Sequence, residues 1–226
     1  AAVLDQLDLS KTDSKLLAII ANVQGAKDAA SHQPIQYLGF PFSISENFQM
    51  RNTHKTIAES LVTLQEILEI ADQNQKEVIA YLSMGFGNPY GDLYDEDLVF
   101  EWVNKLVAMD IGIISLADTV GVATPQQVYD VTSYLVESLP GTEIGVHLHS
   151  TPENWKEKLE AAVRAGCKRF DGALKGIGGC PMADDELVGN MNSELMIQYF
   201  EEKELLTDLN KEALIECLQI AERIFI

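Results

Sequence analysis

Two histidines in an apolar segment are the residues of this chain best placed to do chemistry. They are His147 and His149, in the segment Glu-Ile-Gly-Val-His-Leu-His at residues 143–149. The alternation predicts a β-strand that has its large apolar side chains on one face and both histidines on the other. Because side chains two residues apart on a strand point the same way, both imidazoles could bind one metal ion. A lone buried histidine is more often a core residue, so the pair needs support from other positions.

Apolar runs that alternate with helical patterns predict parallel strands joined by helices. The predicted strands span residues 16–21, 35–39, 77–83, 111–116, 143–149 and 168–174. The predicted helices span residues 25–30, 56–71, 95–109, 124–138, 152–165, 193–203 and 211–223, and residues 40–52 are expected to form a loop. The chain therefore belongs to the α/β class.

Polar residues gather where these strands end. Asn22, Asp118, the two histidines and the loop around Cys180 all lie at or just beyond the carboxyl end of a predicted strand. In a (β/α)8 TIM barrel the carboxyl ends of the strands converge on one face, where active sites are built. A Rossmann-type sheet should instead carry a glycine-rich turn after its first strand, and the sequence has none there. We predict one TIM-barrel catalytic domain over residues 1–226, with about six βα units and two units missing from its start.

Composition narrows the choice of partners. The chain has 226 residues, a formal net charge of −19 and 46% hydrophobic residues. Such an acidic chain disfavours nucleic acid as a partner, and no apolar run is long enough to span a membrane. Three scattered cysteines do not make a disulfide framework, so we expect a reducing compartment and a cytoplasmic protein of bacterial type.

Three stretches carry a family resemblance. They are Ser-Leu-Ala-Asp-Thr-Val-Gly at residues 115–121, Val-His-Leu-His at 146–149 and Gly-Ile-Gly-Gly-Cys-Pro-Met-Ala at 176–183. In this order they resemble the signatures of 3-hydroxy-3-methylglutaryl-CoA lyases, which belong to a wider group of metal-dependent TIM-barrel lyases and Claisen-condensing enzymes. The resemblance extends from about residue 16 to the last helix, and the cysteine loop is its most specific part.

The resemblance implies roles for individual residues. It implies a divalent cation, Mg²⁺ or Mn²⁺, bound by His147, His149 and Asn190. It also implies that His147 or Asp118 accepts a proton from the substrate and that Cys180 carries a proton to the product. The implied substrate-binding residues are Asn22, Arg51, Asn52, Thr119, Gly178 and Gly179.

The reaction implied by this resemblance is cleavage of a carbon–carbon bond. 3-Hydroxy-3-methylglutaryl-CoA would yield acetoacetate and acetyl-CoA, a reaction of leucine degradation and ketone-body formation. The cation would lower the pKa of the tertiary hydroxyl group, and the thioester would take up the electrons as an enolate. The partner is thus an acyl-CoA thioester, and a homodimer is a further expectation.

The sequence also departs from the family pattern. The family's first two strands supply an Arg-Asp pair and a glutamate, and this chain has no segment that matches them. The three remaining metal ligands are neutral, so we expect weak metal binding and little or no activity from the 226-residue chain.

Other interpretations stay open at this stage. Asp118 could simply cap its turn, and Cys180 could be a small core residue. A condensing enzyme of the same barrel group, which joins acetyl-CoA to a 2-oxo acid, would share the two histidines but would not need the cysteine loop. A non-catalytic remnant or binding protein is the third alternative.

Overall fold

A computed structural model of the protein describes residues 2–179, 188–206 and 208–225. The strands are β1 (Leu16–Ile19), β2 (Ile35–Ser43), β3 (Glu77–Ser83), β4 (Ile113–Ala117), β5 (Glu143–His147), β6 (His149–Ser150), β7 (Arg169–Asp171) and β8 (Gly189–Asn190). The α-helices are α1 (Val23–Ala30), α2 (Glu46–Thr53), α3 (Ile57–Gln73), α4 (Glu96–Val107), α5 (Pro125–Ser138), α6 (Trp155–Arg164), α7 (Ser193–Glu202) and α8 (Lys211–Ile224). Two short 3₁₀ turns are η1 (Leu4–Gln6) and η2 (Leu174–Gly176).

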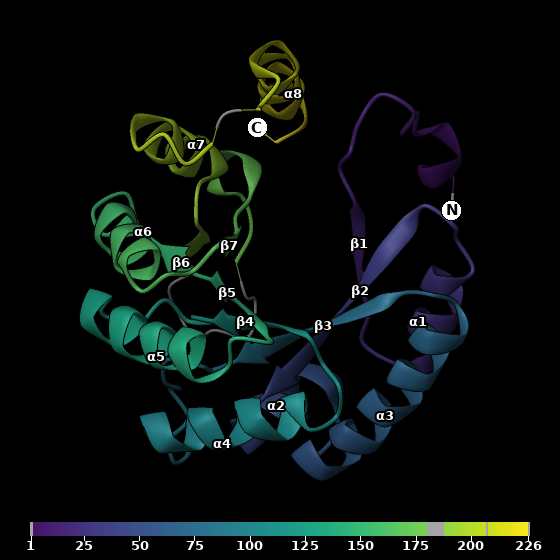
Figure 1. The fold of residues 1–226 in the computed structure, drawn as a ribbon, viewed down its shortest axis with the longest axis vertical. Helices are drawn as coiled ribbons and strands as arrows, with labels where there is room; N and C mark the ends of the chain where they lie inside the picture. Colours follow the sequence, from purple (N-terminus) through teal and green to yellow (C-terminus); the bar gives the residue numbers. More distant parts are fainter. Residues whose placement is uncertain (1, 180–187, 207, 226) are drawn as a thin grey trace.

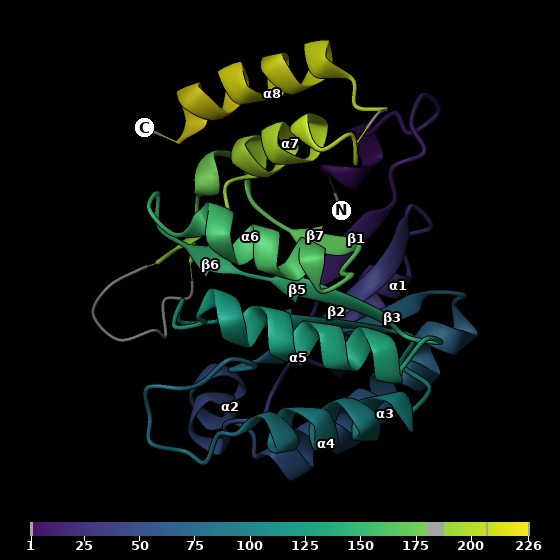
Figure 2. The same ribbon diagram turned by 60° about the vertical axis from the view of Figure 1, so that its left-hand side comes forward.

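Six of the strands form one curled parallel sheet with helices along its outer side (Figure 1). The strand order is β1-β2-β3-β4-β5-β7, so each strand lies beside its predecessor in the sheet, and β6 pairs with β8 in a separate antiparallel ribbon. Figure 2 shows α3, α4, α5 and α6 in succession along the sheet. The predicted α/β architecture with six parallel barrel strands is confirmed.

Alternation along the strands divides apolar from polar side chains. Phe40 and Phe42 of β2, Leu82 of β3 and Leu116 of β4 are buried in the core between sheet and helices. The neighbouring residues of the same strands face the inside of the curled sheet, as residues of alternate parity must. One row on that inner side joins Ala117, His147 and Asp171 in register across β4, β5 and β7.

Side-chain caps begin α3 and α5 where the sequence predicts. Thr56 starts α3 with a capping box to Glu59, and Thr124 starts α5 with a capping box to Gln127 and with Pro125 in the first turn. Each box satisfies amide groups that have no partner inside the helix. The local sequence therefore determines where these two helices begin. Packing against the sheet determines which face of each helix is buried.

The prediction of a loop over residues 40–52 is wrong. Strand β2 continues to Ser43 and pairs with β3 as far as Ser83, because Phe40 and Phe42 keep the alternation that buries them. Ser45 then caps α2 by accepting a hydrogen bond from the Phe48 amide.

The histidine strand and the last predicted strand both end early in the structure. The histidine strand breaks at Leu148, so His147 ends β5 whereas His149 begins β6. The backbone turns there because the Leu148 carbonyl bonds to the amide of Met191, just beyond β8. The strand predicted over residues 168–174 ends at Asp171, and η2 follows it.

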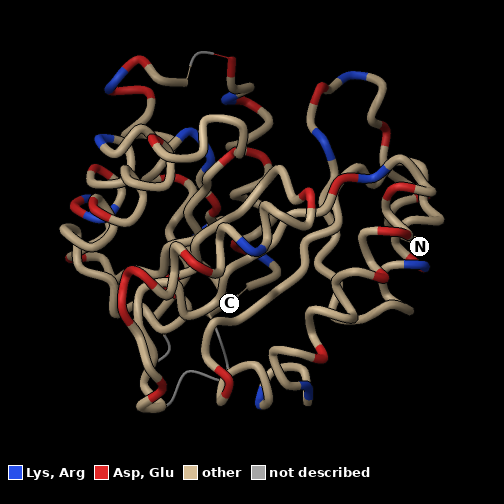
Figure 3. The backbone as a smooth tube through the Cα atoms, turned by 60° about the horizontal axis from the view of Figure 1, so that its bottom comes forward, with Lys and Arg blue, Asp and Glu red and all other residues tan. Residues whose placement is uncertain are grey.

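Acidic residues occur along many of the helices and loops (Figure 3), in keeping with the net charge of −19. Among the described residues, no helix has the length and apolar content needed to cross a lipid bilayer.

Candidate active site

A cavity of about 500 Å³ opens at the carboxyl ends of the parallel strands. It receives the last residues of β1, β3, β4, β5 and β7. Its lining comprises Leu17, Ile19, Pro41, Phe48, Asn52, Tyr81, Ser83, Ala117, Thr119, His147, His149, Asp171, Gly172, Gly179 and Asn190. Six of the residues predicted from the sequence are among them: Asn52, Thr119, His147, His149, Gly179 and Asn190.

His147 is held on two sides at the end of β5. Its Nδ1 atom is buried, has no hydrogen-bond partner among the described residues, and lies 3.6 Å from Oδ2 of Asp171. The same oxygen accepts a hydrogen bond of 3.0 Å from the Ser115 hydroxyl. The ring of Tyr81 meets the imidazole edge-on, with 5.9 Å between ring centroids. The imidazole is therefore placed beside a carboxylate that is itself oriented.

His149 and Asn190 face the same cavity from the β6–β8 ribbon, where they lie opposite each other. The rings of His149 and His147 are 5.3 Å apart between centroids. Burial lowers the pKa of His149 to about 4, and nearby His147 and Lys158 act in the same direction. At neutral pH His149 is thus a neutral imidazole, which is the form that binds metals.

The amide group of Asn190 is oriented by the loop that follows η2. Its Nδ2 donates to the Ile177 carbonyl at 2.9 Å, which leaves the amide oxygen as acceptor or metal ligand. Gly178 has φ +93°, and a Cβ at this position would lie 2.9 Å from Nδ2 of Asn190. Only glycine lets the loop approach Asn190 so closely in this backbone conformation. Cys180, the predicted proton carrier, lies outside the described residues.

Asp118 is buried and is not among the described residues that line the cavity. Its Oδ2 accepts a hydrogen bond of 2.7 Å from Nζ of Lys158, and its Oδ1 accepts one of 3.0 Å from the amide of Ala123. Burial raises the pKa of Asp118, and the ammonium group of Lys158 opposes that shift. These contacts support the alternative that Asp118 holds the turn after β4, and its use as a base stays a prediction.

Two other predicted substrate residues have backbone partners. The side chain of Asn22 caps α1 by accepting a hydrogen bond of 2.8 Å from the Gly25 amide, and Asn22 does not appear in the described lining. Thr119 does line the cavity, and its hydroxyl oxygen accepts a hydrogen bond of 2.9 Å from the Met84 amide. Thr119 therefore joins the ends of β3 and β4 beneath the cavity.

Helix α2 supplies one aromatic and one polar side chain to the lining of the cavity. Phe48 and Asn52 of this helix line the cavity. Arg51 stacks its guanidinium group over the ring of Tyr90, 4.5 Å from the centroid, and is not among the described lining residues. Helix α2, in a range that the sequence predicted as a loop, thus forms one wall of the site.

Sequence reasoning missed Asp171 and Lys158. Asp171 alternates with Phe170 in β7, so the strand period alone places it on the inner, polar side. Lys158 falls on the apolar stripe of α6 with Trp155 and Leu159, and a lysine on such a stripe is a signal of a buried partner. Asp171 also places a carboxylate beside the candidate metal ligand His147.

The donors in the cavity fit a divalent cation. The two imidazoles and the amide oxygen of Asn190 could together bind a divalent cation and leave positions open for water and substrate oxygens. The buried Nδ1 of His147 is the kind of unsatisfied atom that marks a site for an ion or water. Among the described residues, no group of three or more His, Cys, Asp or Glu side chains is placed to hold a metal.

The family model named HMGL-like matches residues 5–221. The chain belongs to the HMGL-like family. It is 29% identical to the hydroxymethylglutaryl-CoA lyase of Bacillus subtilis over 98% of this chain and 75% of that protein. It is also 29% identical to the (R)-citramalyl-CoA lyase of Chloroflexus aurantiacus over 89% of this chain and 63% of that protein.

A solved structure shares the fold of this family member. The hydroxymethylglutaryl-CoA lyase of Acinetobacter baumannii, solved with coenzyme A and 3-methylmalate, is 30% identical and superimposes with a TM-score of 0.84. The match covers 95% of this chain and 69% of that structure. The chain thus spans 63% to 75% of the length of these three relatives. The resemblance to a carbon–carbon lyase family that three sequence stretches indicated is confirmed.

Proposed function

We propose that this chain functions in a hydroxymethylglutaryl-CoA lyase, an enzyme that cleaves 3-hydroxy-3-methylglutaryl-CoA to acetoacetate and acetyl-CoA. The observation that carries the proposal is the convergence of His147, His149, Asn190 and Asp171 on one cavity at the carboxyl ends of the strands. That face is where barrel enzymes build their active sites. Membership of the HMGL-like family supports the same reaction class.

The substrate class follows from the relatives. The named proteins act on hydroxymethylglutaryl-CoA and on (R)-citramalyl-CoA, and the Acinetobacter baumannii structure holds coenzyme A with 3-methylmalate. Each substrate is a CoA thioester of a hydroxylated acid. A tertiary alcohol with a carboxylate nearby is therefore the group that we assign to the cavity, and the thioester extends toward its mouth at Phe48 and Asn52.

The protein residues divide the proton transfers between them. The base that accepts the proton of the substrate hydroxyl is His147 or Asp118, as the family resemblance implies, and Asp171 lies 3.6 Å from Nδ1 of His147, where it restricts the direction of that imidazole. Loss of that proton lets the oxygen form a carbonyl while the bond to the thioester-bearing carbon breaks. Those electrons form the enolate of acetyl-CoA, which Cys180 would protonate as the family resemblance implies.

A divalent cation would complete this site. When bound by His147, His149 and Asn190, it would polarise the oxygens of the substrate and lower the pKa of its hydroxyl group. Gly178 supports Asn190, because its carbonyl accepts a hydrogen bond of 3.3 Å from the Asn190 backbone amide. The identity of the cation, a homodimer and a cytoplasmic location remain predictions.

Release of acetoacetate tests the proposal. The protein, expressed from its complete coding sequence, is incubated with 3-hydroxy-3-methylglutaryl-CoA and Mg²⁺ or Mn²⁺. We expect acetoacetate release that His149→Ala abolishes and that the exposed Lys156→Met control leaves unchanged. Absence of release would reject the lyase proposal, and thiol release from acetyl-CoA with a 2-oxo acid would identify a condensing enzyme instead.

A further inference from the structure

Lys158 is a fully buried lysine behind the candidate active site. It lies on α6 with 1% of its surface exposed. Its ammonium group donates three hydrogen bonds: to Oδ2 of Asp118 at 2.7 Å, to the Gly121 carbonyl at 3.0 Å and to the His149 carbonyl at 3.0 Å. An ammonium group has three N–H donors, so each one is used. Lys158 is consequently unavailable as a nucleophile or a proton donor to substrate.

The buried pair of Lys158 and Asp118 reaches the backbone of both candidate metal ligands. The ammonium group of Lys158 donates a hydrogen bond to the carbonyl of His149. The backbone amide of Asp118 donates one of 3.0 Å to the carbonyl of His147. The second carboxylate oxygen of Asp118 accepts from the Ala123 amide and so fixes the turn after β4. One ion pair thereby connects α6, the β4–α5 turn and the histidine segment.

A gain in the stability of the fold does not by itself explain why this ion pair is buried. Removing two charges from water is costly, and well-packed apolar residues usually stabilise a core as much as a buried ion pair does. The backbone of residues 147–149, however, needs contacts from outside its own strands to fix its position. His149 lies in β6, a strand of two residues that, within the described part of the chain, pairs with the equally short β8, so its own ladder constrains it weakly.

We propose that Lys158 is a positioning residue which, together with Asp118, holds the backbone of residues 147–149 and thereby directs both imidazoles into the cavity. The proposal deepens the proposed function, on which it rests, since it concerns the same metal-binding pair. Outer-shell partners of metal ligands change metal affinity by about 10–100-fold when they are removed.

Variants separate positioning from simple charge neutralisation. Lys158→Met removes the three donors and leaves the Asp118 carboxylate buried without its cation, so it lowers both stability and affinity for Mn²⁺. The double variant Asp118→Asn with Lys158→Met removes that charge and regains stability, but the His149 carbonyl still has no anchor. Leu159→Ala is the stability-matched control, because Leu159 is a core residue of the same helix. Lys156→Met controls for loss of a positive charge on α6.

The readouts are Mn²⁺ affinity by electron paramagnetic resonance, the unfolding temperature, and crystal structures of the metal-free wild type and double variant. We expect the double variant to bind Mn²⁺ about 10–100-fold more weakly than the wild type, while Leu159→Ala and Lys156→Met bind as the wild type does. A double variant with wild-type Mn²⁺ affinity would overturn the inference.

The crystal structures distinguish this inference from the proposed function. If the wild type itself binds no Mn²⁺, the proposed metal site is wrong, and the position of His149 then decides the inference. A displaced His149 imidazole in the metal-free double variant supports the positioning role. An imidazole in the wild-type position overturns it.

Discussion

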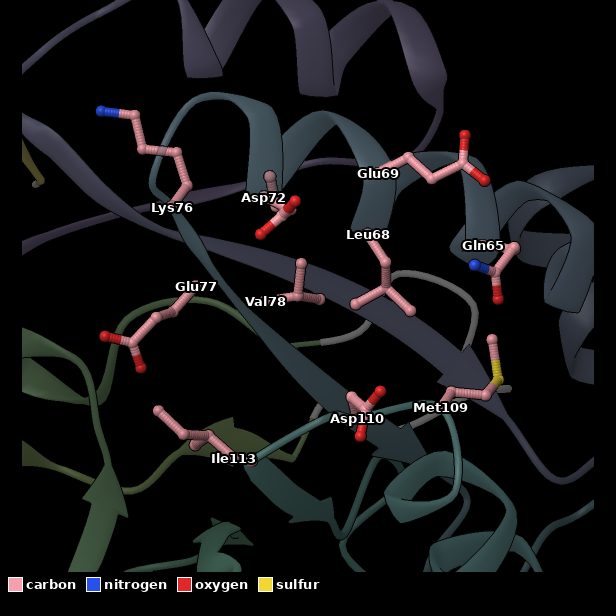
Figure 4. A pocket seen from close by; sticks show the side chains of 12 residues that line it. Gln65, Leu68, Glu69, Asp72, Lys76, Glu77, Val78, Met109, Asp110 and Ile113 are labelled. Atoms are coloured by element: carbon pink, nitrogen blue, oxygen red, sulfur yellow. The ribbon is translucent and has the colours of Figure 1, made fainter.

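Two cavities of nearly equal volume lie at opposite ends of the parallel sheet. One holds the histidine pair at the carboxyl ends of the strands and measures about 500 Å³. The other measures about 510 Å³ and lies at the amino ends of β3 and β4, where α3, the start of β3 and the α4–β4 connection supply its side chains (Figure 4). Volume therefore does not tell the two ends apart.

The two cavities differ in how far their polar side chains are buried and oriented. The cavity of Figure 4 has acidic side chains that are exposed to solvent: Glu69, Asp72, Glu77 and Asp110. The lysine in the described lining of this cavity, Lys76, donates to the carbonyls of His32 and Gln33. At the other end His149 is buried, and its neighbours are oriented by hydrogen bonds. Burial and fixed geometry give a group the altered pKa and the restricted direction that catalysis uses.

Removal of a metal ligand from the carboxyl-end cavity should cause the largest loss of Mn²⁺ affinity among these variants. His149→Ala removes one of two imidazoles from the carboxyl-end cavity, so Mn²⁺ affinity should fall by more than the about 10–100-fold that loss of an outer-shell partner causes. Titration of free Mn²⁺ by electron paramagnetic resonance measures this change. An unchanged affinity would show that the histidine pair holds no metal.

Loss of the Asp171 charge should give the next largest effect. Asp171→Asn keeps the shape of the side chain and an acceptor for Ser115, but it removes the carboxylate beside His147. Mn²⁺ affinity should fall by about 10–100-fold, which is about 1.4–2.7 kcal/mol. The same titration reports it, and equal affinity in Asp171→Asn would restrict the site to neutral ligands.

A pair of glycine variants sharpens the comparison further. Gly178→Ala and Gly91→Ala both place a Cβ on a residue of positive φ, which costs about 1–2 kcal/mol in each case. Only at Gly178 does the new atom meet Asn190, since nothing lies within 4 Å of a Cβ at Gly91. We expect both variants to unfold more easily in urea and only Gly178→Ala to lose Mn²⁺ affinity. Equal Mn²⁺ affinity in the two variants would remove the Gly178 loop from the site.

Variants at the amino end should have the smallest effect. Glu69→Gln with Asp110→Asn removes two exposed charges, and such surface changes usually alter the free energy of unfolding by less than about 0.5 kcal/mol. Mn²⁺ affinity should equal that of the wild type. A marked loss of affinity would mean that the cavity of Figure 4 binds the cation.

Much of the scaffold could be predicted because its signals are local. A buried parallel strand is a short apolar run, and Thr56 and Thr124 mark helix starts with capping boxes. The end of β2 could not be predicted in this way, since Pro41 interrupts the run and pairing with β3 carries the strand on to Ser43.

The site was harder to predict because its contacts join distant positions. The histidine pair was visible from its spacing, but Asp171 reaches His147 only after β5 and β7 pair. The partner of Asp118 is Lys158, forty residues later in the chain, so sequence could not decide between a base and a structural acid. Three-dimensional pairing, which no local pattern encodes, settles which side chains share the cavity.

The position of a bound Mn²⁺ ion tests the account most directly. Crystals of the protein soaked in Mn²⁺ would be measured for anomalous scattering. The account predicts one strong peak in the carboxyl-end cavity, within coordination distance of His147, His149 and Asn190. A peak among the acidic residues of the amino-end cavity, with none beside the histidines, would contradict it.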